Sequence, residues 1–370
     1  MEQNKFHKNF KLNGLSFSSV DELLVHTKDL PGEINQFLKS WFSVDQKITV
    51  QTSGSTGVPK LILLNKDFVV NSAKATGSYF NLKEHTTALL CLPLKYIAGK
   101  LMLIRAITLG WELDVIESSS NPLEKVNKPY DFSAMVPLQL ENSLFKLHLI
   151  KKLIVGGGLV SKELEYKIQH LSTAIFATYG MTETITHIAV KKLNKHMLLK
   201  EGVKNNSFSD KNINSLKDAS INAFYQILPD VTIYKDKRDC LVIDAPKVSD
   251  EIIFTNDVVQ LISDNEFEWL GRFDNVINSG GIKLYPEKIE EKFSNIIMNR
   301  FFVSGIPDEK LGEKLVLIIE GKKQVIKYKN LGLSKFETPK KVYFLEQFVE
   351  TETKKIQRKK TLDLLNFDNY

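Results

Sequence analysis

From about residue 47 onward, short apolar runs of strand length alternate with longer segments that have helical spacing. The apolar runs are expected to form buried strands, and they are TTALLCLP (86–93), WELDVIE (111–117), YDFSAMVP (130–137), KKLIVGGG (151–158) and TAIFATYG (173–180). The segments with helical spacing lie between them, at 67–80, 97–110, 137–147 and 161–171. This alternation predicts an α/β fold in which a mainly parallel sheet is covered by helices and binding sites lie at the C-terminal ends of the strands.

A break in this pattern follows GRFDN (271–275) and predicts a second domain. After the break, PEKIEEKFSNII (286–297) begins with a proline suited to the first turn of a helix, and LVLIIEG and KKVYFLE have the composition of strands. We therefore expect a large N-terminal domain over residues 1–273 and a small, mobile α+β C-terminal domain over residues 274–370. The polar stretch 200–220 is expected to be an exposed loop of the large domain.

The composition argues against several classes of protein. Apolar residues make up 43% of the chain and charged residues 25%, as in ordinary globular proteins. The net charge of +6 is not gathered in a basic stripe with stacking aromatic residues, so nucleic acid is not an expected partner. No apolar run approaches the ~18 residues of a membrane helix, which predicts no membrane insertion. Cys91 and Cys240 offer no disulfide framework and no metal-ligand spacing, and with no signal-peptide pattern we expect a reducing, cytoplasmic location.

The stretch QTSGSTGVPK (51–60) lies between the apolar runs KITV and LILLN and is expected to join two strands. It is not a Walker loop, because its spacing differs from G-x-x-x-x-G-K-[ST] and a strand, not a helix, follows. Its glycines let the backbone turn freely, and its hydroxyl and backbone N–H groups can surround phosphate oxygens beside a lysine ammonium group. The candidate phosphate-binding residues are Thr52, Ser53, Gly54, Ser55, Thr56, Gly57 and Lys60. A polar hairpin turn is the alternative.

Two further candidate groups follow predicted strands. In YGMTE (179–183), Thr182 could donate to a phosphate and Glu183 is a hard oxygen ligand suited to Mg²⁺, although the pair could also cap a helix. In GGGLV (156–160), the missing side chains let a purine pack flat against the backbone, and a plain strand-to-helix turn is the alternative.

Two acidic residues and an arginine near the domain break complete the set. Asp257, in TNDVV, could accept hydrogen bonds from two ribose hydroxyls, or it could be an ordinary turn residue. Arg272, in GRFD, suits a phosphate or a ribose, and Asp274 stands at the domain break; a surface ion pair between the two is the alternative.

In order, TSGSTGVPK, GGGLV, YGMTE, TND, GRFDNVINSGGIKLYPEKIE and KKIQR resemble the motifs of the adenylate-forming superfamily of acyl-CoA ligases, adenylation domains and luciferases. The resemblance covers about residues 47–360. It implies a reaction in two steps. A small-molecule carboxylate attacks the α-phosphorus of ATP to give an acyl-adenylate and pyrophosphate, and a thiol, usually coenzyme A, then displaces AMP. The implied cofactors are ATP, Mg²⁺ and coenzyme A.

The resemblance also implies roles for single residues. Lys355 aligns with the adenylation lysine, with Lys354 as the alternative register, and its ammonium group would stabilise the negative charge that develops during adenylation. Asp274 matches the hinge about which the small domain rotates between the two steps. The implied catalytic residues are Lys355, Glu183 and Thr182, with Glu183 as the metal ligand. The implied nucleotide-binding residues are those of the phosphate loop together with Gly156, Gly157, Gly158, Tyr179, Gly180, Asp257 and Arg272. The coenzyme A tunnel would include Gly280 and Gly281.

The segment LPLKYIAGKLMLIRA (92–106) looks like a segment of one compact branch, the o-succinylbenzoate–CoA ligases of menaquinone biosynthesis. Arg105 falls where that branch carries an arginine thought to face a substrate carboxylate, and a buried second carboxylate needs such a cation. The alternative is that Arg105 reaches to the surface of its helix. The candidate substrate-binding residues are Tyr96, which replaces the histidine of the branch, Gly99, Arg105 and His187, and a satisfied core histidine is an equal interpretation of the last.

Three other functions stay open on the sequence alone. They are a ligase for another aryl or fatty acid, a stand-alone adenylation domain that loads a carrier-protein thiol, and a non-catalytic protein that binds nucleotides or nucleic acid. The nearly complete set of motifs argues against the third. The sequence also leaves open whether the chain forms a homodimer.

Overall fold

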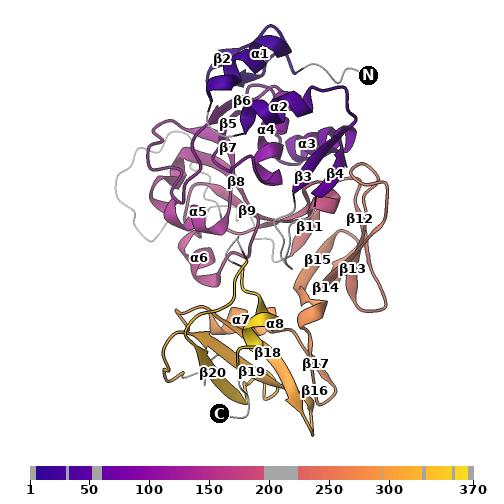
Figure 1. Cartoon of the computed structure of the whole chain (residues 1–370), viewed down its shortest axis with the longest axis vertical. Helices are drawn as coiled ribbons and strands as arrows, with labels where there is room; N and C mark the ends of the chain where they lie inside the picture. Colours follow the sequence, from indigo (N-terminus) through magenta and orange to yellow (C-terminus); the bar gives the residue numbers. More distant parts are fainter. Residues whose placement is uncertain are drawn as a thin grey trace, which may run out of the picture.

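The computed structural model describes residues 6–30, 33–51, 61–195, 224–294, 296–326, 331–351 and 355–365. The phosphate-loop candidates at 52–57 and 60, the alternative lysine Lys354 and the polar stretch 200–220 lie outside these residues. Figure 1 shows two bodies joined end to end. We call the described residues up to Arg272 the large body and those from Ile277 onward the small body.

One half of a 13-stranded sheet in the large body is parallel. Its strands are, in spatial order, β1 (Lys11–Leu12), β6 (Glu112–Val115), β5 (Thr87–Leu90), β7 (Tyr130–Met135), β8 (Ile150–Val155) and β9 (Ala174–Gly180). Strands β5, β7 and β8 are each followed by a helix, and a parallel neighbour requires such a crossover connection. These strands confirm the α/β fold that the alternating sequence pattern predicts.

The other half of the sheet is antiparallel, so the complete sheet is mixed. From β9 outward it contains β10 (His187–Lys192), β11 (Tyr225–Ile227), β15 (Glu266–Arg272), β14 (Ile253–Ser263), β13 (Cys240–Asp244) and β12 (Thr232–Lys235), and β2 (Leu15–Ser16) lies at the opposite edge. Strands β12 to β15 follow one another through short turns, which suit antiparallel pairing.

Helices cover both faces of the parallel half, and each face has its own core. The first core lies under α1 (Val20–His26), η1 (Thr27–Asp29), α2 (Ile34–Trp41), α3 (Lys66–Tyr79) and α4 (Ile97–Leu109). The second lies under α5 (Pro137–Asn142), η2 (Leu144–Leu149) and α6 (Lys162–Lys167). Successive strand residues enter opposite cores: Leu90 packs in the first and Leu89 in the second.

The β3 (Lys47–Gln51) and β4 (Leu61–Asn65) strands pair antiparallel in a separate two-stranded sheet. The segment 52–60 therefore joins two strands, as its sequence predicts. Asn65 caps the following helix, α3, by accepting a hydrogen bond from the backbone of Asp67. Figure 1 places this hairpin beside α3, on the side of the large body that carries β12.

The small body is built on a five-stranded sheet. Its elements are β16 (Ile277–Ser279), β17 (Ile282–Leu284), α7 (Pro286–Phe293), β18 (Phe301–Asp308), β19 (Gly312–Glu320), β20 (Lys341–Leu345) and α8 (Arg358–Leu362). Helix α7 starts at Pro286, as the sequence predicts, and buries Ile289 and Phe293 in the core. The short η5 (Phe273–Asn275) connects the small body to β15.

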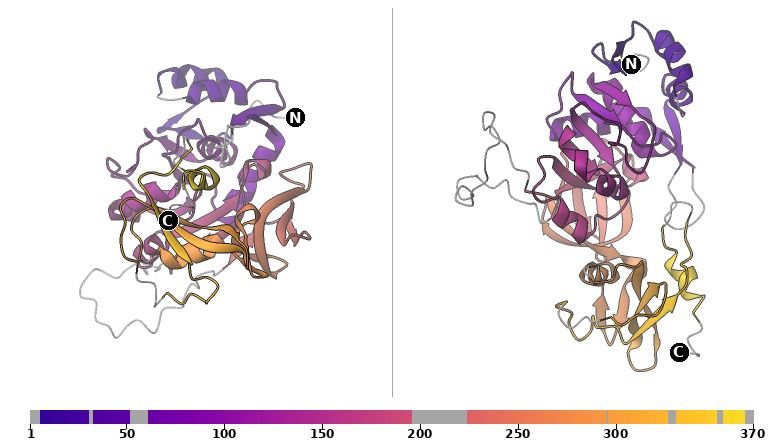
Figure 2. Two further views of the ribbon diagram at one scale, coloured as in Figure 1. Left: turned by 60° about the horizontal axis from the view of Figure 1, so that its bottom comes forward. Right: turned by 90° about the vertical axis from the view of Figure 1, so that its left-hand side faces the viewer.

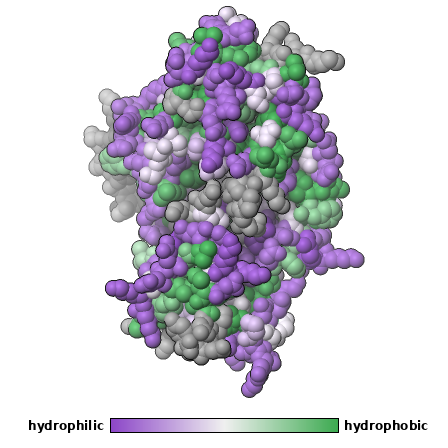
Figure 3. Space-filling model, viewed as in Figure 1, coloured by the Kyte–Doolittle hydropathy of each residue, from purple (hydrophilic) through white to green (hydrophobic). Residues whose placement is uncertain are grey.

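Charged side chains make several contacts between the two bodies. Lys162 on α6 pairs with Glu291 on α7 at 2.8 Å, and Lys288 on α7 pairs with Glu268 on β15. All four side chains are between 31% and 41% exposed. In the right-hand view of Figure 2 the orange and yellow small body again lies at one end of the large body. Hydrophilic side chains dominate the face shown in Figure 3, where apolar groups gather in separate patches.

Within the described ranges, no helix combines the length and the apolar character that a bilayer crossing requires.

Candidate active site

Asp257 is a buried carboxylate at the centre of a partly buried hydrogen-bond cluster beside the end of β9. Tyr179 Oη donates to Asp257 Oδ2 at 2.7 Å, and Trp269 Nε1 donates to Asp257 Oδ1 at 3.2 Å. Arg272 Nη1 lies 3.6 Å from Asp257 Oδ1, because Arg272 on β15 pairs in register with Asp257 on β14. Asp257 is 7% exposed. The structure therefore brings three candidates together, although Tyr179 stands 78 positions before Asp257 in the sequence, and adds Trp269.

The protonation of Tyr179 is fixed by its surroundings. Burial, and then the charge of Asp257, raise the pKa of the Tyr179 phenol well above its usual value. The hydroxyl group therefore keeps its proton and remains a donor to the carboxylate. Arg272 Nη2 also lies 3.4 Å from Asp274 Oδ2, so the surface ion pair considered above does exist, alongside the contact with Asp257.

Arg238, which is not among the candidates from the sequence, holds the TND segment (255–257) in place through hydrogen bonds. Its Nη1 donates to Asn256 Oδ1 at 2.9 Å and its Nη2 to the carbonyl oxygen of Thr255 at 3.0 Å. The guanidinium group also lies 5.4 Å from the ring centroid of Phe273. No sequence signal distinguishes this arginine from an ordinary turn residue between β12 and β13.

Gly180, the last residue of β9, lies so close to the backbone of Thr186 and His187 that no side chain fits at this position. An added Cβ would lie 2.1 Å from the carbonyl oxygen of Thr186 and 2.5 Å from the Cα of His187. Ile185, in the turn between Gly180 and Thr186, has a φ of 63°, which is rare for a β-branched residue. The turn after YGMTE is therefore folded back tightly onto the end of β9, with Thr182 and Glu183 in the short η3 (Thr182–Thr184).

The first of the three glycines after β8 lies close to the end of β9. Gly156 is half-buried, and an added Cβ would lie 2.7 Å from Thr178 Oγ1, one residue before Tyr179. Gly157 has a φ of 78° and, like Gly158, is exposed. The backbone here is bare, as a flat ligand would need.

Glu183 is exposed at the same edge of the sheet. Among the residues that the structure describes, no group of three or more His, Cys, Asp or Glu side chains could hold a metal by themselves. A single carboxylate is nevertheless a usual protein ligand for Mg²⁺ when substrate phosphates and water complete the octahedron.

Arg105 is buried inside α4, with 2% of its surface exposed. Its Nε donates to Thr76 Oγ1 at 3.3 Å and its Nη2 to Thr186 Oγ1 at 3.4 Å. No carboxylate lies within ion-pair distance of it in the described part of the chain. Burial lowers the pKa of the guanidinium group to about 10. The alternative that Arg105 reaches the surface is wrong, because α4 is buried on nearly all sides and the guanidinium group stays inside.

His187, on the first residue of β10, lies next to Arg105. Thr186 Oγ1 is 3.3 Å from His187 Nδ1, while His187 Nε2 is buried and has no hydrogen-bond partner among the described residues. Burial and the charge of Arg105 lower the pKa of the imidazole to about 3. His187 is therefore neutral at physiological pH, and it is not a fully satisfied core histidine.

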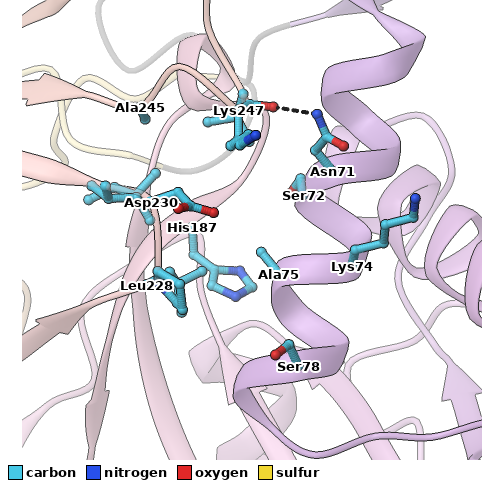
Figure 4. A pocket seen from close by; sticks show the side chains of 14 residues that line it. Asn71, Ser72, Lys74, Ala75, Ser78, His187, Leu228, Asp230, Ala245 and Lys247 are labelled. Atoms are coloured by element: carbon cyan, nitrogen blue, oxygen red, sulfur yellow. Dashed lines mark hydrogen bonds between the residues drawn. The ribbon is translucent and has the colours of Figure 1, made fainter.

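A pocket of about 310 Å³ opens between α3 and the strands that follow β9, and His187 lines it (Figure 4). In Figure 4 the imidazole ring points from β10 toward α3, where Ala75 and Ser78 are labelled. The apolar residues of the lining are Ala75, Ile188, Leu228, Pro229, Val231, Ala245 and Val248, and the polar ones besides His187 are Asn71, Ser72, Lys74, Ser78, Asp230 and Lys247.

Tyr96 and Gly99 lie at the start of α4. Tyr96 is the residue before the first turn and is half-buried. An added Cβ on Gly99 would lie 2.4 Å from the carbonyl oxygen of Pro93, so this glycine allows the helix to pack against the LPL segment. Gly99 thus has a packing role, whatever else it does.

Lys355 belongs to the small body, beyond β20. Its backbone N–H donates to Thr351 Oγ1 at 3.1 Å, and its carbonyl oxygen accepts from the Thr351 N–H at 2.9 Å. Three residues later, Arg358 makes two hydrogen bonds with Glu290 on α7, at 2.6 and 2.7 Å. The yellow segment before α8 rises toward the large body in Figure 1. Gly280 and Gly281 form the exposed turn between β16 and β17, with φ values of 59° and 81°.

Comparison with known proteins identifies the family of this chain. The family model of the AMP-binding enzymes matches residues 49–203. A solved acyl-CoA synthetase (AMP-forming)/AMP-acid ligase II-like protein from Dyadobacter fermentans is 35% identical, over 89% of this chain and 92% of that protein, with a TM-score of 0.57. The chain therefore belongs to the AMP-binding enzyme family, and it is an AMP-forming ligase.

More specific relatives are found within that family. The 2-succinylbenzoate–CoA ligase of Bacillus mycoides is 26% identical over 353 residues, which are 89% of this chain and 72% of the relative. The solved o-succinylbenzoate coenzyme A synthetase of Bacillus subtilis, in complex with ATP and magnesium ion, is 19% identical with a TM-score of 0.68, over 93% of this chain and 82% of that one. The second likeness shows a shared fold.

Proposed function

We propose that this enzyme activates the dicarboxylic acid 2-succinylbenzoate with ATP and transfers the acyl group to coenzyme A, in menaquinone biosynthesis. Its relatives carry that name. The observation that carries the proposal within this chain is Arg105, a buried guanidinium group whose partners among the described residues are neutral hydroxyl groups.

A buried charge without an opposite charge is costly, and it calls for a partner from outside the chain. A ligand carboxylate at Arg105 would supply that partner. The acid activated by the enzyme must present a different carboxylate to ATP, since a carboxylate held by Arg105 is neutralised and turned away from the nucleotide. A substrate with two carboxylates meets both demands, whereas a fatty acid would leave Arg105 unpaired.

The nucleotide would bind at the Asp257 cluster. Asp257 would accept hydrogen bonds from the ribose hydroxyls, Tyr179 and Arg272 would hold that carboxylate in place, and the bare backbone at Gly156–Gly158 would face the purine. Thr182 and the residues at 52–57 and 60 would bind the phosphates. Mg²⁺, held by Glu183 and phosphate oxygens, would neutralise the charge of the phosphates.

Lys355 would act in the first step, where its ammonium group stabilises the charge shared by the attacking carboxylate and the α-phosphate. We propose residues 1–273 and 274–370 as the two domains, with Asp274 as the hinge between them. Rotation there would withdraw Lys355 and bring the Gly280–Gly281 turn toward the acyl-adenylate for the approach of coenzyme A.

Release of pyrophosphate, measured with a panel of acids, tests the proposal. We expect turnover with 2-succinylbenzoate and at least tenfold lower kcat/KM with 4-oxo-4-phenylbutanoate, which keeps the ketone and the aliphatic carboxylate but lacks the aromatic carboxylate. Equal activity with both acids would contradict the role of Arg105, and a preference for long fatty acids would indicate another ligase of the family. Thioester formation with coenzyme A, compared with a carrier protein, identifies the acceptor thiol.

A further inference from the structure

The imidazole of His187 carries a buried polar atom that the chain does not use. His187 is 6% exposed, and its Nε2 has no hydrogen-bond partner among the described residues. A buried donor or acceptor that loses water and gains no partner destabilises the fold, so such atoms usually have a specific reason. His187 also lines the pocket between α3 and the antiparallel strands.

The neighbouring side chains favour one of the two ring nitrogens as the carrier of the proton. The guanidinium group of Arg105 can only donate, so Thr186 Oγ1 accepts the hydrogen bond from its Nη2 at 3.4 Å. The hydroxyl proton of Thr186 is then free to point at His187 Nδ1, 3.3 Å away. Thr186 Oγ1 could instead accept from an Nδ1–H group, but its own proton would then have no acceptor among the described residues. The arrangement that leaves fewest groups unpaired has Nδ1 accept, which puts the proton of the neutral ring on Nε2. His187, which lines the pocket, thus carries a buried N–H donor that has no acceptor among the described residues.

This donor lies on the side of the site where the acid, and not the nucleotide base, is proposed to bind. His187 pairs in register with Gly180, and the Thr186 backbone touches the same glycine, so the ring starts beside the YGMTE turn. On its other side it is coupled through Thr186 to Arg105, the proposed partner of the second carboxylate. An acid that reaches from the turn to Arg105 therefore passes His187 between its two carboxylates.

We propose that His187 is a specificity-determining residue whose Nε2–H donates a hydrogen bond to the ketone oxygen of the acid, so that the enzyme selects a keto-dicarboxylate. This inference rests on the proposed function, because it assumes that the acid lies between the YGMTE turn and Arg105. The ketone of 2-succinylbenzoate stands between its two carboxylates, which is the place where the donor is found. The neutral state of His187 suits a neutral acceptor better than a third carboxylate.

The test compares 2-succinylbenzoate with its methylene analogue, 2-(3-carboxypropyl)benzoate, which keeps both carboxylates and lacks the ketone. A binding site that leaves a buried donor unpaired discriminates against such an analogue, and we expect the wild-type enzyme to prefer the ketone by about 10- to 100-fold in kcat/KM for pyrophosphate release. In His187→Phe, which keeps a ring but has no donor, this preference is expected to fall to about onefold. The exposed His170→Asn serves as the matched control and is expected to keep the wild-type preference.

A direct measurement keeps the inference testable if His187→Phe does not fold. With ¹⁵N-labelled histidine in the wild-type protein, Nε2 of His187 should show the chemical shift of a protonated nitrogen, and its proton should move downfield with 2-succinylbenzoate but not with the methylene analogue. A protonated Nδ1, or an equal response to the two acids, would overturn the inference. A wild-type enzyme that activates 2-succinylbenzoate without preferring it to the analogue would do the same while leaving the proposed function intact. Failure to activate 2-succinylbenzoate at all would refute the proposed function itself.

Discussion

Replacing Arg105 by methionine should separate two effects of its buried charge, the destabilisation of the fold and the binding of a substrate carboxylate. The pKa of the guanidinium group is lowered to about 10, and one pH unit of pKa corresponds to about 1.4 kcal/mol, so burial destabilises the charged form on the order of 3 kcal/mol. Arg105→Met removes this term, loses two long hydrogen bonds to threonine hydroxyls and nearly preserves the apolar volume. We expect the free energy of unfolding without substrate to rise by about 1–2 kcal/mol.

Arg105→Met should also be much less active with 2-succinylbenzoate. Removing one partner of a buried charge pair costs about 2–5 kcal/mol, so kcat/KM for 2-succinylbenzoate should fall at least 30-fold. Activity with 4-oxo-4-phenylbutanoate, which has no aromatic carboxylate, should change less than threefold. Urea unfolding gives the stability, and pyrophosphate release gives both activities. If Arg105→Met were less stable than the wild type by 2 kcal/mol or more, the guanidinium group would have a charged partner within the folded chain and the reasoning would be refuted.

Three further predictions follow from the same site. In the folded state His187 stays neutral down to about pH 3, whereas in the unfolded chain it binds a proton below about pH 6.5, so the free energy of unfolding falls as the pH is lowered. Between pH 7 and pH 5, the wild type should therefore lose about 2 kcal/mol more than His187→Phe, as measured by urea unfolding. Tyr179→Phe should raise KM for ATP about tenfold with a smaller change in kcat, since Asp257 loses one donor but keeps others; an unchanged KM would remove Asp257 from the nucleotide site. Gly180→Ala should lower the melting temperature and the activity together, because the new Cβ would overlap the carbonyl oxygen of Thr186, and a destabilisation of about 1–3 kcal/mol is expected.

Much of the architecture can be read from the sequence because its strands and helices repeat regularly. The apolar runs ending at GGGLV and YGMTE became β8 and β9, and the proline at 286 marked the start of α7. The antiparallel half was harder to foresee. Its pairing depends on which distant strands meet, as when β11 inserts between β10 and β15, and no local pattern specifies that.

The candidate site, too, could be predicted only in part from the sequence. Asp257 and Tyr179 could be named from their motifs, but their hydrogen bond joins residues 78 positions apart, and Trp269 was not recognised. For Arg105, helical spacing could not decide between a surface and a buried position, since α4 is apolar on nearly every side. Its threonine partners, Thr76 and Thr186, lie in segments whose sequences carry no sign of the contact.

The double hydrogen bond between Arg358 and Glu290 has a mechanical consequence. Glu290 is part of α7, and a bidentate pair leaves little freedom to twist, so the segment that follows Lys355 turns with that helix as one piece. Helix α7 in turn rests on the large body partly through half-exposed ion pairs, which contribute little individually and are screened by salt. If Lys355 acts as proposed, its position relative to the large body depends on the orientation of α7. Because salt screens these ion pairs, higher ionic strength should make it easier for α7 to separate from the large body.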